Sequence, residues 1–234
     1  MEKPPIVSEE PLTVVFKNFM RNRMVNLSAI SVKHFLPNAK FYCATFYKQS
    51  MDEYADQEQL NDDIIEFTAQ TKWDSGKNVH DHEIQGHTSG FGHPLNGCFF
   101  TEGYNVIQEF FKDTEEHILM LAEDHYFTTG ATLREVMLKD WDVLWIGWDG
   151  DNVNAANASM LGVRPKTLAS FFPMPEHPGM VELIIGSEFV KPIRQAGLRD
   201  RQVTTRNGVD YMGDGEWVNS SVHIQRHLEQ VGIL

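Results

Sequence analysis

The sequence predicts an α/β fold in which a mostly parallel central sheet is flanked by helices. Along residues 12–148, short apolar runs that favour strands alternate with amphipathic segments that favour helices. This order predicts parallel strands joined by crossover connections. Residues 149–181 are instead rich in Asn, Gly and Pro, which predicts a loop-rich C-terminal half. We therefore expect one domain over residues 1–234, divided into halves at 12–148 and 149–234.

Strands are expected where apolar, β-branched and aromatic residues cluster, and helices where apolar residues recur every three or four positions. In the first half, the predicted strands are Leu12–Phe16, Lys40–Tyr47, His117–Leu121 and Trp141–Trp148. The predicted helices are Arg21–Leu36, which Pro37 ends, Asp52–Trp73, a helix through Phe100–Phe111, and Ala131–Lys139. In the second half we expect a strand at Glu182–Gly186, a short helix at Ser187–Ala196 and a last helix that reaches Leu234.

Composition excludes several classes of protein. The formal net charge of −13 argues against nucleic acid as the main partner, because its phosphates are bound by clustered Lys and Arg. No apolar run reaches the roughly 18–20 residues that cross a bilayer, and Met1–Pro5 lacks the layout of a secretory signal. Two cysteines, Cys43 and Cys98, do not make a disulfide framework. We expect a cytoplasmic protein without a membrane span, in a cell or, for a viral protein, in its host.

An acidic cluster directly follows one predicted strand. The apolar run His117–Leu121 leads to Glu123, Asp124 and His125. In open α/β sheets, ligands bind outside the carboxyl ends of the strands, and carboxylates there can hold Mg²⁺ or Mn²⁺ together with a phosphate ligand. Such an ion can neutralise a departing diphosphate as a Lewis acid. The cluster therefore predicts a metal-dependent enzyme that acts on a nucleotide sugar, although acidic residues also end strands simply by facing solvent.

The run Leu121-Ala122-Glu123-Asp124-His125-Tyr126 resembles the metal motif of the GT-A glycosyltransferases. It looks most like the Glu-Glu-Asp-His-Tyr and Glu-Asp-Asp variants of the Golgi N-acetylglucosaminyltransferases, although Ala122 stands where some of them carry an acid. The resemblance implies a Rossmann-like GT-A fold, Mn²⁺ or Mg²⁺ bound by Asp124, and a nucleotide-sugar donor, with UDP favoured. It implies hexosyl or N-acetylhexosaminyl transfer to a glycan or other hydroxyl acceptor. The membrane anchor and stem of that family are missing, so we expect a soluble bacterial or viral version.

The same resemblance implies roles for residues elsewhere in the chain. A late histidine completes the metal site in many GT-A enzymes, which indicates His223, with His125 as a further candidate ligand and His227 as a possible replacement. The loop after the first strand contacts the nucleotide, which indicates Asn18, Arg21 and Arg23. By its chemistry, a guanidinium group matches phosphate oxygens. Arginine in a first helical turn also opposes the helix dipole, a mismatch that a bound anion would remove.

A base is needed to deprotonate the acceptor hydroxyl if the reaction inverts the anomeric centre. The glycine-rich run from Asp210 to Trp217 carries acids and an aromatic residue that could stack on a sugar. We therefore name Asp210, Asp214 and Glu216 as candidate catalytic residues. Retention and inversion both stay open, as do the sugar, the nucleotide and the acceptor.

Two other functions remain open. The histidine-rich segment His80–His93 could bind Zn²⁺ and serve a metal-dependent hydrolase. The chain could also be a non-catalytic carbohydrate-binding protein, with its acids merely solvated. A nucleotidyltransferase is less well supported, because the run Lys17–Arg23 lacks the glycines of a phosphate loop.

Overall fold

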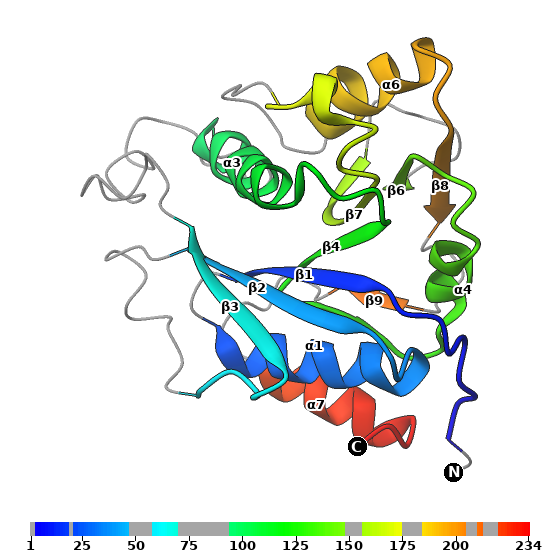
Figure 1. The fold of residues 1–234 in the computed structure, drawn as a ribbon. Helices are drawn as coiled ribbons and strands as arrows, with labels where there is room; N and C mark the ends of the chain where they lie inside the picture. The colour runs from blue at the N-terminus through cyan, green and yellow to red at the C-terminus, as the bar shows by residue number, and fades with distance from the viewer. Residues whose placement is uncertain are drawn as a thin grey trace.

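The computed structural model confirms the predicted α/β fold with a mostly parallel central sheet flanked by helices (Figure 1). It describes residues 3–18, 21–46, 58–69, 94–147, 156–174, 184–204, 210–212 and 220–234. The strands are β1 (Thr13–Asn18), β2 (Lys40–Phe46), β3 (Ile64–Ala69), β4 (Ile118–Ala122), β5 (His125–Phe127), β6 (Val143–Gly147), β7 (Ala156–Val163), β8 (Asp200–Thr204) and β9 (Asp210–Met212). The α-helices are α1 (Asn22–Phe35), α3 (Pro94–Phe111), α4 (Ala131–Met137), α6 (Lys191–Gln195) and α7 (Ser220–Gln230), with a 3₁₀ turn η3 (Ala169–Phe171) and a π-helix η4 (Ile184–Val190).

Seven strands form the main sheet in the order β3-β2-β1-β4-β7-β6-β8, and β5 pairs with β9 in a small second sheet. Within the main sheet only β7 runs antiparallel to its neighbours β4 and β6. From β1 the chain moves outward to β2 and β3, and then returns to the other side of β1 with β4. The junction of β1 and β4 is therefore a topological switch point, where open α/β sheets bind their ligands.

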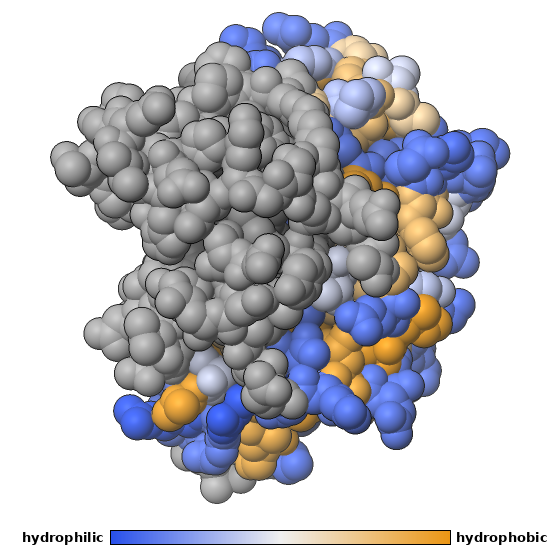
Figure 2. All heavy atoms as spheres, turned by 90° about the vertical axis from the view of Figure 1, so that its left-hand side faces the viewer, coloured by the Kyte–Doolittle hydropathy of each residue, from blue (hydrophilic) through white to orange (hydrophobic). Residues whose placement is uncertain are grey.

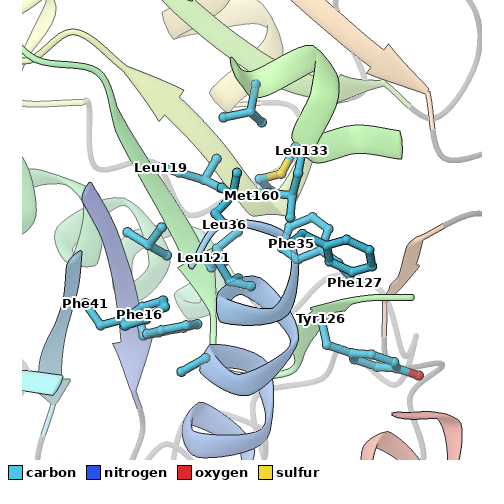
Figure 3. Close-up of a cluster of buried hydrophobic side chains, with 14 of the residues drawn as sticks. Phe16, Phe35, Leu36, Phe41, Leu119, Leu121, Tyr126, Phe127, Leu133 and Met160 are labelled. Carbon is cyan, nitrogen blue, oxygen red and sulfur yellow. The ribbon is translucent and has the colours of Figure 1, made fainter. Parts of the chain in front are cut away.

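Apolar side chains cover both faces of the sheet and fix which helices pack there. On one face, Phe16, Leu119 and Leu121 pack with Phe35 of α1 and Leu133 of α4 (Figure 3). α7 lies against α1 on this side of the sheet (Figure 1). On the opposite face, alternate residues of the same strands pack under α3, η4 and α6. Because strand side chains alternate between faces, both helical layers are held by the same short strands.

Cys43 is a buried thiol of the core, within the apolar strand β2. Of the helices within the described ranges, none combines the length and apolar character that a bilayer span requires.

The predicted helix Asp52–Trp73 is wrong, because its C-terminal part forms the edge strand β3. Ile64 is 7% exposed and its neighbour Ile65 is 57% exposed, which is the two-residue alternation of a strand. β-Branched and aromatic residues at 64–68 favour this state. Leu60, Ile64 and Phe67 are also spaced as one face of a helix, which made this acidic segment look helical.

The irregular character predicted for residues 149–181 is also wrong in part, because β7 occupies Ala156–Val163. Five of its eight residues are Ala, Asn, Ser or Gly, which have weak strand preference, so the strand gave little signal. Packing explains why one of these residues, Gly162, is a glycine. A Cβ atom at Gly162 would lie 2.8 Å from the Trp141 side chain, so the site accepts only glycine without rearrangement.

The predicted strand Glu182–Gly186 is wrong as well, because the described part of it is helical and belongs to η4. The buried residues Ile185, Phe189 and Ile193 recur at helical spacing, and η4 continues directly into α6. The five glycines of residues 74–97 favour a loop, yet the end of this segment is helical, because α3 begins at Pro94, a residue type that suits a helix start. Residues 74–93 lie outside the described residues.

Candidate active site at the switch point

The candidate site lies at the carboxyl ends of β1 and β4. Lys17 pairs in register with Ala122, so the residues that follow these strands lie beside each other. Asn18 ends β1, Glu123 and Asp124 follow β4, and α1 begins with Arg21 as its N-cap. The structure thus gathers Asn18, Arg21, Glu123 and Asp124 at one edge of the sheet, which is where the sequence predicted a nucleotide site.

Arg21 and Asn18 face the acidic residues across this junction. Arg21 Nη1 lies 3.7 Å from Glu123 Oε1, and both side chains are buried. The Asn18 side chain accepts a hydrogen bond of 2.8 Å from the Arg21 amide and donates one of 2.7 Å to Asn22. Asn18 therefore closes the turn that presents Arg21, which is a structural role beside the predicted ligand contact.

Arg23 points elsewhere. Its Nη2 donates to Gln225 Oε1 of α7 at 2.8 Å, and its Nε lies 3.9 Å from Glu58 Oε2. In this structure Arg23 joins α1 to α7, so the predicted contact with a nucleotide remains a prediction.

The two carboxyl groups are held in surroundings that disfavour their charge. Burial and the neighbouring Asp124 raise the pKa of Glu123 to about 7, although Arg21 and Lys17 act in the opposite direction. Burial also raises the pKa of Asp124, which still has partial contact with solvent. An additional cation at this site would favour both ionised forms.

Lys17 is a charged residue of this site that the sequence interpretation did not single out. Its side chain is completely buried on the α3 face, and Nζ lies 3.6 Å from the centroid of the Tyr104 ring. Burial lowers the pKa of Lys17 to about 7, while the charges of Glu123 and Asp124 counteract this shift. A lysine at the end of the apolar run Thr13–Phe16 was the available signal.

His125 is positioned inside the protein and not toward bulk solvent. It is 1% exposed, and its Nδ1 hydrogen-bonds Ser159 Oγ of β7 at 3.0 Å. Burial, with the charge of Lys17, lowers the pKa of His125 to about 3, so its ring is neutral at physiological pH. Neutral imidazole is the form that binds metals.

His223 lies on α7, one helical turn before His227, and the two rings are 4.2 Å apart. His227 Nδ1 hydrogen-bonds the Tyr126 hydroxyl of β5 at 2.7 Å, so α7 is attached to the strand that follows the acidic residues. Among residues 3–234 that the structure describes, no three His, Cys, Asp or Glu side chains gather as a metal site. The metal shell of Asp124, His125 and His223 therefore stays a prediction.

The predicted catalytic acids lie partly beyond the described residues. β9 places the backbone of Asp210 opposite Phe127, three residues after Asp124. Asp214, Glu216 and the histidine-rich segment His80–His93 lie outside the described residues. Figure 2 views the molecule from this side, and the described residues visible in that view are mainly hydrophilic, with hydrophobic ones between them.

The acidic pair fits a hard divalent cation. Glu123 and Asp124 supply carboxylate oxygens, the ligands that Mg²⁺ and Mn²⁺ prefer, and these ions complete their shells with water and phosphate oxygens. Both carboxyl groups have raised pKa values, so a cation would relieve a cost that the fold already carries. A site with one or two protein carboxylates would suffice.

The sequence matches no protein-family model, and no curated protein matches it at a significant level. Solved structures are similar in shape. Two structures of the glycosyltransferase GlyE from Streptococcus pneumoniae TIGR4 match with 16% identity each and TM-scores of 0.45 and 0.49, over 82% and 84% of this chain. This chain spans less than half of GlyE, 45% and 46%.

A further structure, named as a nucleotide-diphospho-sugar transferase from Desulfovibrio desulfuricans G20, matches with 11% identity and a TM-score of 0.46. That match covers 94% of this chain and 95% of the other. The TM-scores of all three structures are below 0.5, so their named activities are properties of those proteins and carry no weight for this chain.

Proposed function

We propose that this chain is a metal-dependent glycosyltransferase that moves a sugar from a nucleotide-diphosphate sugar to a hydroxyl acceptor. A UDP-sugar is the favoured donor, and a hexosyl or N-acetylhexosaminyl group the favoured cargo, by resemblance of the acidic motif. Mn²⁺ or Mg²⁺ is the proposed cofactor. The resemblance covers few residues, so the proposal depends mainly on the site.

One observation carries the proposal: buried and partly buried groups of opposite charge converge at the switch point of the sheet. Arg21 comes from the N-terminus of α1, and Glu123 and Asp124 come from the end of β4. A helix N-terminus with a guanidinium group suits a diphosphate, and adjacent carboxylates suit a divalent cation. A nucleotide diphosphate bound through a metal combines both requirements in one ligand.

The roles of the residues follow from their positions. Asp124, which keeps contact with solvent, would hold the metal, while Glu123 would act through water or the ribose. The metal, when bound, would neutralise the departing diphosphate. Arg21 would contact the diphosphate, and Asn18 would keep Arg21 in place through its backbone amide. His125 and His223 are proposed as additional metal ligands.

The proposed acceptor side is built by the second half of the chain. Asp210 is the favoured base among the three candidates, because the pairing of β9 with β5 brings its backbone near the acidic turn, which is formed by Glu123 and Asp124 between β4 and β5. Asp214 and Glu216 remain candidates on the same stretch of sequence. A base within hydrogen-bond reach of the acceptor hydroxyl is required for inversion.

The test is calorimetric titration of UDP and GDP, with and without MnCl₂, into the wild type, Asp124→Asn and Asp113→Asn. Asp113 is an exposed aspartate before β4, at the opposite edge, and serves as the matched control. We expect one nucleotide to bind in a metal-dependent way, with affinity reduced about a hundredfold or more in Asp124→Asn and unchanged in Asp113→Asn.

Donor hydrolysis, followed by mass spectrometry over a set of UDP- and GDP-sugars, would then identify the sugar. Wild-type protein that binds neither nucleotide with Mn²⁺ would contradict the proposal. Tightly bound Zn²⁺ that is lost on changing His80 and His82 would favour the hydrolase instead. Sugar binding that ignores metal and nucleotide would favour a carbohydrate-binding protein.

A further inference from the structure

Two serines on the buried face of α1 connect this helix to the acidic turn. Ser28 and Ser31 are completely buried, on a helix face that is otherwise lined by apolar residues such as Val25 and Val32. Burying a hydroxyl group in such surroundings costs free energy unless the group forms hydrogen bonds. The partners of these two hydroxyls therefore show what the serines do.

Both hydroxyls are bonded, and their bonds bracket the acidic turn. Ser28 Oγ donates to the carbonyl oxygen of Glu123 at 3.0 Å. The Phe127 amide donates to Ser31 Oγ at 3.1 Å, and this hydroxyl in turn donates to the Ser28 carbonyl oxygen at 2.7 Å. One serine thus holds the chain where it leaves β4, and the other holds it two residues after His125. Asp124 lies between these two attachment points.

The same helix also carries the cationic side of the site. Its N-cap is Arg21, whose guanidinium approaches Glu123 at 3.7 Å. A helix is a rigid element, so its first residue and its two serines keep a fixed separation. Through α1, the position of the acidic turn is therefore tied to the position of Arg21.

We propose that Ser28 and Ser31 are positioning residues that set the acidic turn at a fixed place relative to the N-terminus of α1. This inference rests on the proposed function, since it assigns the N-terminus of α1 to the diphosphate and the two serines of α1 to the turn that would hold the metal. A turn that can shift would still offer its carboxylates to a metal. It would no longer hold that metal at the place where the diphosphate meets Arg21.

The measurable consequence is a change in the coupling between metal and nucleotide. We define the metal enhancement factor as the dissociation constant of the nucleotide without MnCl₂ divided by that with MnCl₂. Linkage makes this factor equal to the effect of nucleotide on the affinity for Mn²⁺. General destabilisation of the fold leaves it unchanged as long as the protein is folded.

The experiment measures this factor by titrating UDP and GDP into the wild type, Ser28→Ala, Ser31→Ala and Val32→Ala. Val32 is completely buried on the same helix and loses core packing without losing a bond to the turn, so it is the matched control. We expect the factor to fall about tenfold in Ser28→Ala, in line with the loss of one buried hydrogen bond, and to keep its wild-type value in Val32→Ala. Hydrogen exchange of the Phe127 amide should accelerate in Ser31→Ala.

Three outcomes are distinguishable. A metal enhancement factor near one in the wild type would contradict the proposed function, and this inference with it. A large wild-type factor that Ser28→Ala and Ser31→Ala both retain would overturn the inference and leave the proposed function intact. An equal loss in Val32→Ala would also overturn it, because the effect would then belong to packing of α1. If Ser28→Ala does not fold, Ser31→Ala decides by the same factor.

Discussion

The two edges of the central sheet each hold a buried carboxyl group beside arginine side chains and use it in opposite ways. At the amino ends of β6 and β8, Asp142 accepts hydrogen bonds from Arg164 at 2.9 Å and from Arg199 at 2.9, 3.1 and 3.2 Å. At the carboxyl ends of β1 and β4, Glu123 approaches Arg21 only to 3.7 Å, beyond hydrogen-bond distance.

The acidities of the two edges differ accordingly. Burial by itself would raise the pKa of Asp142, but hydrogen bonds from Arg199 and Arg164 outweigh it and lower the pKa to about 2. The pKa of Glu123 is raised to about 7. The amino edge therefore stabilises the fold with its charges, whereas the carboxyl edge holds charges at a cost. Such a cost is retained where a ligand completes the site.

The largest effect on stability is expected from Asp142→Asn. The substitution turns an acceptor of two arginines into a group that presents an amide to them, and it leaves the Arg199 amide without its carboxylate. Because Arg164 and Arg199 keep partial contact with water, we expect a loss of about 2 kcal/mol in the free energy of unfolding. Urea denaturation measures it. Nucleotide affinity should stay unchanged. A loss of affinity alongside the loss of stability would contradict the conclusion that the two edges act independently.

The opposite sign is expected for Lys17→Met at the carboxyl edge. Methionine matches the length of the lysine stem and needs no charge in the core beside Tyr104, so stability at pH 7 should rise by about 1–2 kcal/mol. The pKa of Lys17 is about 7 in the folded protein and 10.5 in its ordinary state, so unfolding takes up a proton between these values. The free energy of unfolding of the wild type should therefore increase as pH rises from 7 to 10. Lys17→Met should not show this increase. Thermal unfolding across that range tests both statements, and destabilisation at pH 7 would contradict them.

Acid should remove the stabilisation that the ion pairs of Asp142 provide at the amino edge. The folded pKa of Asp142 is about 2, below the usual value of 3.8, so its ion pairs contribute full stability above pH 4. This contribution disappears as pH falls toward 2, because the carboxyl group then takes up a proton in both states. The difference in unfolding free energy between wild type and Asp142→Asn should shrink by about 1–2 kcal/mol between pH 5 and pH 2. A difference that stays constant over this range would show that Asp142 acts through packing alone.

The smallest effect is expected from Glu115→Gln, also at the amino edge. Glu115 pairs with Lys166 at 2.7 Å, and both side chains are largely exposed, with 62% and 57% of their surface accessible. Water and salt screen such a pair, and ordering two long side chains offsets the remaining attraction. We expect no measurable change in the urea midpoint at 0.15 M salt. A clear loss would mean that exposed pairs also belong to the stabilising network around Asp142.

Sequence patterns predicted those elements whose apolar period is unambiguous. β1, α1, β2, β4 and β6 are found within two residues of the predicted bounds, because continuous apolar runs and a proline stop mark them. β7 and the small strands β5, β8 and β9 were not predicted, because they depend on partners distant in sequence. Ile64–Ala69 was assigned to a helix because strand and helix periods are hard to separate over six residues.

The candidate site was predictable only where it follows a strand directly. Asp124 and Arg21 stand at the ends of obvious elements, so the parallel order placed them at one edge. The ion pair of Arg21 with Glu123, the burial of Lys17 over Tyr104 and the bonds of Ser28 and Ser31 depend on side-chain directions. The spacing of apolar residues along the sequence does not determine these directions. A lysine at the end of an apolar strand and two serines on an apolar helix face were the available signals, and the sequence interpretation did not use them.

The contact between α1 and α7 has a consequence for how the protein is made. Arg23 of α1 bonds Gln225 of α7, across a separation of 202 residues. At a synthesis rate of about 5–20 residues per second, the ribosome delivers α7 roughly 10–40 s after α1. During that interval the surface of α1 that α7 later covers is exposed to chaperones and to other nascent chains. The covering of this surface of α1 thus depends on a segment that is synthesised 202 residues later.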